Sequence, residues 1–96
     1  MSAGLDWRSL REIDLASSRP KGSAFRAFKR LRSDFAESRD YVVLHHQDDA
    51  QAIGALHAAG RIYRGSINVV LLAPAAAQRV LDALNGAVAA PAPRRQ

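Results

Sequence analysis

The chain has 96 residues, of which 48% are hydrophobic, and its 14 Lys and Arg residues against 9 Asp and Glu residues give a net charge of +5. A chain of this length forms one small domain, which excludes a multidomain enzyme. It contains no cysteine, so disulfides, thiolate zinc sites and cysteine nucleophiles are excluded as well.

The positive charge is concentrated in one segment. Residues 19–33 contain six cations and no acid, whereas residues 34–60 have a net charge of −4. An acid-free basic segment suits a polyanion such as nucleic acid, because each phosphate contact releases counterions. The alternative interpretation is a solvated charged face.

Neither a membrane span nor a targeting segment is expected. The longest uncharged run, residues 65–78, is interrupted by Pro74 and is too short to cross a bilayer. Residues 1–15 carry several charges, which interrupt any signal-peptide core. We therefore expect a cytoplasmic protein that has no membrane contact.

The first predicted elements surround the basic segment. Glu12–Leu15 alternate polar and apolar residues, which predicts a short strand. A break over residues 19–22 precedes Ser23, which is a good N-cap for a helix over residues 24–36. One face of this helix is apolar and the opposite face is basic. The apolar stripe consists of Ala24, Phe28, Leu31 and Phe35, widened by Phe25, and the opposite cations are Arg26, Lys29 and Arg30.

A strand and a second helix are predicted next. Tyr41–Leu44 are rich in β-branched and aromatic residues, which favours a strand. Asp48 and Asp49 are candidate caps for a helix that ends near Ala59, where Gly60 stops it.

The last third of the chain predicts a hairpin and a helix. The two strands are Arg61–Arg64 and Ile67–Leu72, joined at Gly65-Ser66, and the second strand is apolar enough to be central and buried on both faces. Pro74 suits the first turn of a helix that ends at Gly86.

The element order β-α-β-α-ββ-α predicts an α/β (α+β) domain over residues 1–86, with three helices packed on a short sheet. Residues 87–96 have no periodicity, and we expect a disordered tail. A strand separates the first two predicted helices, so this order does not predict a standard helix-turn-helix. Many of the apolar residues are alanine, and the modest core leaves a homodimer open as an alternative to a monomer.

The loop Arg19-Pro20-Lys21-Gly22-Ser23 is a candidate phosphate contact because it leads into a helix N-terminus. Unpaired amides, a glycine and an adjacent lysine suit a phosphate oxygen. The order of a Walker A loop is absent, so nucleotide hydrolysis is not implied. The alternative is an ordinary loop and cap.

The segment Arg61-Ile62-Tyr63-Arg64 is a second candidate contact. A ribbon that carries Arg61 and Arg64 could follow a nucleic-acid backbone, with Tyr63 available to stack on a base. Alternatively, Tyr63 is a cross-strand residue and the arginines are solvated. The two candidates support each other only if they share a face.

No catalytic residues, metal site or cofactor are expected. Adjacent side chains on a strand point to opposite faces, so His45 and His46 do not jointly bind one ion there. No nucleophile stands beside a base in a recognisable pattern, which favours a protein that is not an enzyme.

The stretch from Phe28 to Leu44 resembles small phage DNA-binding domains of the KilA-N/Bro-N type. Those domains have a basic helix ending in Phe, a polar turn, then Asp-Tyr and a strand, and Arg64–Leu72 is similar to their closing strand. The chain departs from them in having Ser38 where glycine is usual and in an unmatched N-terminal third. The resemblance implies DNA binding in a phage, plasmid or other mobile element.

Our leading hypothesis is a small nucleic-acid-binding regulator of transcription, with DNA favoured over RNA. The alternative is a protein-interaction module, an inhibitor or adaptor, whose basic face docks an acidic protein partner. The residues expected to contact nucleic acid are Arg19, Lys21, Ser23, Arg26, Lys29, Arg30, Arg61, Tyr63 and Arg64.

Overall fold

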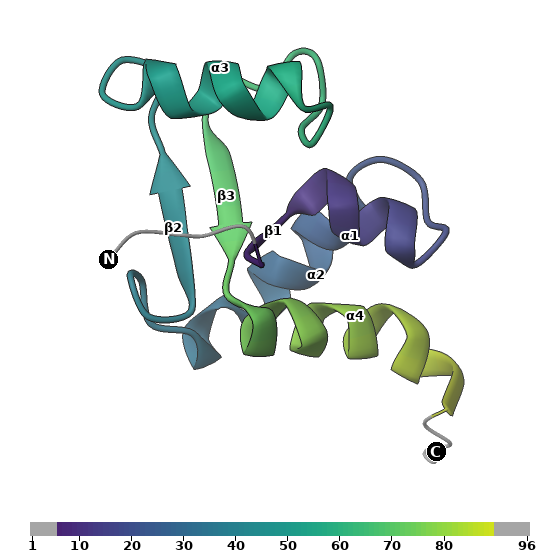
Figure 1. Ribbon diagram of the computed structural model, residues 1–96. Helices are drawn as coiled ribbons and strands as arrows, with labels where there is room; N and C mark the ends of the chain where they lie inside the picture. Colours follow the sequence, from purple (N-terminus) through teal and green to yellow (C-terminus); the bar gives the residue numbers. More distant parts are fainter. Residues whose placement is uncertain (1–5, 90–96) are drawn as a thin grey trace.

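Residues 6–89, which the computed structural model describes with side chains up to Asn85, form four α-helices and a three-stranded antiparallel sheet (Figure 1). This arrangement confirms the expected α+β class. In chain order the elements are β1 (Arg8–Ser9), α1 (Leu10–Ala16), α2 (Ser23–Leu31), the 3-10 turn η1 (Arg32–Asp34), β2 (Tyr41–Leu44), α3 (Ala50–Ala58), β3 (Val69–Leu72) and α4 (Pro74–Ala89).

Strand β3 lies between β1 and β2 and is antiparallel to both. Its pairing with β2 runs from Val69 opposite Leu44 to Leu72 opposite Tyr41. Side chains alternate along a strand, so Leu72 faces one core and Val69 faces the other. The prediction of a central strand that is buried on both faces is therefore confirmed for β3.

The sheet separates two hydrophobic cores. The larger core lies between the sheet and helices α1, α2 and α4, and the smaller core lies beneath α3, which crosses one end of β2 and β3 in Figure 1. The buried residues of the larger core are Ile13, Ala24, Ala27, Phe28, Tyr41, Leu72, Ala76, Ala77, Val80 and Leu84. Those of the smaller core are Ile53, Leu56, Ile62, Val69 and Leu71.

Helix α1 replaces the strand predicted over Glu12–Leu15. It begins with a capping box, in which the Ser9 hydroxyl accepts the Glu12 N–H at 3.1 Å and the Glu12 carboxylate accepts the Ser9 N–H at 2.9 Å. Ile13 then points into the larger core with 1% of its surface exposed. A four-residue alternation is too short to distinguish a strand from a helix, whereas Ser-x-x-Glu is a helix-start pattern.

Helix α2 ends at Leu31 rather than at the predicted Ala36, and η1 continues the chain to Asp34. The chain then turns, because Asp40 Oδ2 accepts the Ala36 N–H at 2.8 Å. Ser38 in this turn has a φ of 78°, in the left-handed region that favours glycine.

The predicted hairpin at Gly65-Ser66 is wrong. Residues 61–68 form an irregular loop, in which the Ser66 N–H donates to the Tyr63 carbonyl at 3.0 Å. Strand β3 already pairs with β2 on one edge and with β1 on the other, so it has no edge for Arg61–Arg64. Three helices were expected on the sheet, and α1 is the additional one.

Both remaining helices begin where they were predicted. Asp49 is the N-cap residue of α3, although its carboxylate accepts the His45 N–H at 2.9 Å instead of an amide of the helix. Pro74 is the first residue of α4. Gly86 does not end α4, which continues to Ala89 into the segment expected to be a tail. The rest of that segment, residues 90–96, lies outside the described residues.

Candidate nucleic-acid interface

Helices α1 and α2 pack against each other and are joined by a turn over residues 17–22. The turn has six residues, longer than the roughly 3–4 residues of a standard helix-turn-helix, so the two helices form a helical hairpin that we term the α1–α2 pair. The sequence predicts a strand in place of the first helix and therefore does not predict this pair. The capping box at Ser9 and Glu12 is the feature that would have revealed it.

Asp14 of α1 fixes the start of α2. Asp14 is 1% exposed, and its carboxylate accepts the Ala24 N–H at 2.7 Å and the Gly22 N–H at 3.1 Å. A carboxylate is favourable there because the N-terminus of a helix carries partial positive charge. These two amides therefore face an internal anion and are not open to a phosphate, in contrast to the expectation for this loop.

Gly22, not Ser23, is the N-cap residue of α2. Gly22 has a φ of 95°, which favours glycine, and a Cβ atom there would lie 3.1 Å from an Arg26 nitrogen. Ser23 is the first residue of the helix and is buried, so the surface described next does not include it.

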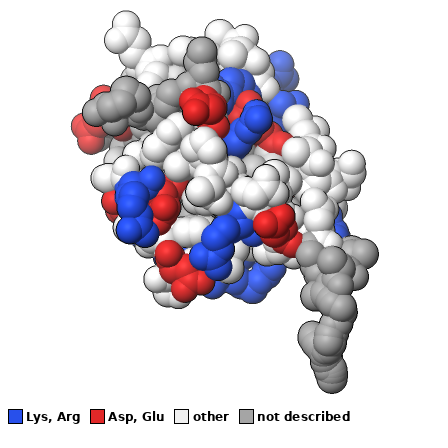
Figure 2. Space-filling view, turned by 60° about the horizontal axis from the view of Figure 1, so that its bottom comes forward, with Lys and Arg blue, Asp and Glu red and all other residues white. Residues whose placement is uncertain are grey.

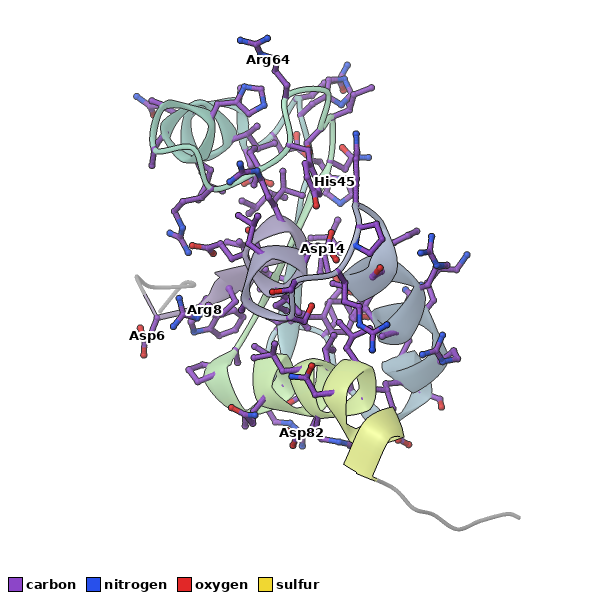
Figure 3. All side chains as sticks on the ribbon, turned by 90° about the vertical axis from the view of Figure 1, so that its right-hand side faces the viewer. Asp6, Arg8, Asp14, His45, Arg64 and Asp82 are labelled. Atoms are coloured by element: carbon purple, nitrogen blue, oxygen red, sulfur yellow. The ribbon has the colours of Figure 1, made fainter. Side chains whose placement is uncertain are left out.

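The outer face of α2 carries an exposed group of side chains that we term the α2 surface. Side chains that end in nitrogen project outward from this helix in Figure 3. The α2 surface consists of Lys21, at the entrance to the helix, and Phe25, Arg26, Lys29 and Arg30 on the helix. It brings together four of the cations that the sequence predicted to contact nucleic acid. Phe25, expected to widen the core stripe, instead lies 44% exposed among them.

Two other predicted contacts are held by the domain itself. An Arg19 nitrogen donates to the Leu84 carbonyl at 2.6 Å, so this side chain reaches α4. Arg61 forms a two-pronged ion pair with Glu12, with both N···O distances at 3.0 Å, and also donates to the Trp7 carbonyl. Burial raises the pKa of Glu12, but hydrogen bonds from Arg61 and Ser9 outweigh it and leave the pKa below its ordinary value.

Tyr63 links the 61–68 loop to the α1–α2 pair. Its hydroxyl donates to Asp14 Oδ2 at 2.5 Å, and Lys21 Nζ lies 4.9 Å from the centre of its ring. The two segments that were predicted to contact nucleic acid therefore meet at Tyr63. Arg64 is exposed and projects from the end of the molecule opposite Asp82 (Figure 3).

The hydrogen bond of Tyr63 predicts a loss of stability at alkaline pH. Burial and the Asp14 carboxylate raise the pKa of Tyr63 to about 12, whereas a tyrosine in an unfolded chain titrates near about 10. The folded state holds the phenol proton of Tyr63 more tightly than the unfolded chain does. The contribution of the Tyr63–Asp14 hydrogen bond to stability is therefore complete below pH ~10 and is lost towards pH ~12.

The difference in unfolding free energy between the wild type and Tyr63→Phe should therefore shrink as the pH rises from about 9 to about 12. Urea denaturation at several pH values measures this difference. A difference that stays constant over this interval would contradict the Tyr63–Asp14 bond.

Charges of both signs are mixed on the face shown in Figure 2, where Lys and Arg side chains lie beside Asp and Glu. Within residues 6–85, the ion pairs are Arg39–Asp40, Arg61–Glu12 and Arg79–Asp34. None of these pairs includes a cation of the α2 surface, which therefore keeps its positive charge.

The comparisons with known proteins give no match: no family model, no curated protein and no solved structure is found. In the part of the chain whose side chains are described, no group of three or more His, Asp or Glu residues could hold a metal ion. No helix among the described residues is long and apolar enough to cross a membrane. The features that bear on function are therefore the geometry and charge of the α2 surface.

Proposed function

We propose that the protein is a small DNA-binding regulator that places α2 in the major groove. In DNA-binding proteins with a helix-turn-helix, the second helix enters this groove and its N-terminal residues approach the bases. Helix α2 is likewise the second helix of the α1–α2 pair, and its first turn presents Phe25 and Arg26 to solvent. The resemblance to phage domains of the KilA-N/Bro-N type implies the same activity.

The observation that carries this proposal is the acid-free, exposed α2 surface on a helix whose start is fixed by Asp14. Four exposed cations lie within residues 21–30, namely Lys21, Arg26, Lys29 and Arg30. Cations of this kind neutralise phosphates on both sides of a groove, while the fixed helix start sets their direction. Arg64 is assigned an auxiliary phosphate contact from the neighbouring loop.

Duplex DNA suits this surface better than duplex RNA. The major groove of B-form DNA admits an α-helix, whereas that of A-form RNA is deep and narrow. The proposal therefore commits to DNA as the partner of α2.

Reversing two charges of the α2 surface tests this proposal. With five phosphate contacts, four from the α2 surface and one from Arg64, log affinity for duplex DNA should fall with log salt with a slope of about −4.5. The double variant Arg26→Glu and Arg30→Glu should weaken binding at least about tenfold in low salt and reduce the slope to about −3. Fluorescence anisotropy with a labelled duplex at several salt concentrations measures both quantities.

The matched control reverses two exposed arginines outside α2, Arg8→Glu and Arg79→Glu, and changes the net charge by the same amount, with the loss of only one exposed ion pair, Arg79–Asp34. It should retain most of the affinity and the slope of the wild type. Equal losses in the two double variants would contradict binding through α2. A wild-type protein that binds no duplex at low salt would overturn the proposed function.

A further inference from the structure

The exposed aromatic ring of Phe25 is not explained by the fold. Phe25 is 44% exposed, while Phe28, one turn later on the same helix, is 3% exposed and fills the larger core. An aromatic side chain loses favourable burial when it stays in water, and cations alone would suffice for phosphate contacts. The ring is therefore available to a partner outside the domain, beside the cations of the α2 surface.

The position of Phe25 on α2 indicates which chemical group its ring would contact. It lies in the first turn of α2, where residues of a second helix approach the base edges. Lys29 Nζ lies 5.4 Å from the centre of the ring, so a cation suited to a phosphate stands beside an apolar group. In the major groove, the apolar feature among the base edges is the 5-methyl group of thymine.

We propose that Phe25 is a specificity-determining residue that reads the 5-methyl group of a thymine. The ring borders a pocket of about 220 Å³, which lies between α2 and the 61–68 loop and has Leu10 and Val70 among its apolar walls. This pocket leaves room beside the ring for the approaching methyl group. The inference rests on the proposed function, because it assigns a base contact to the same helix.

The test removes the methyl group and nothing else. A duplex that the wild type selects from a random-sequence library is synthesised with each thymine replaced, one at a time, by deoxyuridine, which keeps every hydrogen-bonding group. At one position the replacement should weaken wild-type binding about fourfold, which corresponds to one buried methyl group. In Phe25→Ala the same replacement should have no effect.

Leu15→Ala is the matched control, because Leu15 is 59% exposed on α1 and its removal should leave the thymine preference intact. Thermal unfolding of both variants checks that they fold. A selected duplex that binds equally well with uracil at every position would overturn the inference and leave DNA binding standing. A thymine preference that survives in Phe25→Ala, or a library without a preferred sequence, would overturn it as well. Absence of all duplex binding would overturn the proposed function and this inference together.

Discussion

Replacing Phe28 by alanine should destabilise the domain by about 4 kcal/mol, because removal of a buried aromatic ring loses its transfer free energy and leaves a cavity. Phe28 is 3% exposed. Its ring meets Tyr41 edge-on at a centroid distance of 5.0 Å and stacks on Phe35 at 6.1 Å. This cluster joins α2 to the sheet, so its loss affects the whole larger core.

The matched control is Phe25→Ala, which removes the same side chain from the same helix where it is 44% exposed. Its cost should stay below about 1 kcal/mol, as is usual for surface positions. Urea denaturation followed by circular dichroism gives both free energies of unfolding. Similar losses in the two variants would contradict the assignment of Phe28 to the core and Phe25 to the surface.

These two phenylalanines show how far periodicity predicts a fold. The spacing of Ala24, Phe28 and Leu31 predicted the buried face of α2, and the structure confirms it, with Leu31 partly buried. Phe25 lies at the border of that stripe, where the pattern of a helix does not decide between core and solvent. Only the position of α1 and α4 against α2 decides it, and that is a property of tertiary packing.

The parts that sequence reasoning missed depend on contacts between distant residues. Glu12 and Asp14 looked like the polar positions of a strand, but they bind Arg61 and Tyr63, each 49 residues later. Partners so far apart leave no local pattern. For the same reason, the sequence predicts a hairpin strand at the loop that carries Tyr63 and does not predict the α1–α2 pair.

The basic segment, in contrast, was visible in the sequence because charge density is a local property. Lys21, Arg26, Lys29 and Arg30 lie together on an exposed surface. Arg19 and Arg61 are also cations that the sequence predicted to contact nucleic acid. However, Arg19 donates to the Leu84 carbonyl and Arg61 pairs with the Glu12 carboxylate, so both side chains are held within the domain. The number of cations in the sequence therefore predicts a basic surface, but it does not predict which of the cations are left free to bind a partner.

Removal of the Asp14 carboxylate should be as damaging as removal of a core ring. In Asp14→Ala, the N–H groups of Gly22 and Ala24 and the hydroxyl of Tyr63 lose their acceptor inside the domain. The buried Ala24 donor without a partner costs about 1–3 kcal/mol and each of the two half-buried donors loses a hydrogen bond of about 0.5–1.5 kcal/mol, so we expect a total loss of about 2–6 kcal/mol.

Asp82→Ala is the control, since Asp82 is an exposed carboxylate that accepts a hydrogen bond from Gln78 on the same helix. Its free energy of unfolding should change by less than about 0.5 kcal/mol. Amide hydrogen exchange supplies a second measurement, because Asp14→Ala should accelerate exchange at Ala24 more than at Leu72 in the central strand. If Asp14→Ala lowers the free energy of unfolding no more than Asp82→Ala does, the Asp14 carboxylate does not fix the start of α2. In that case the direction in which the α2 surface faces must be set by the packing of Ala24 and Phe28 alone.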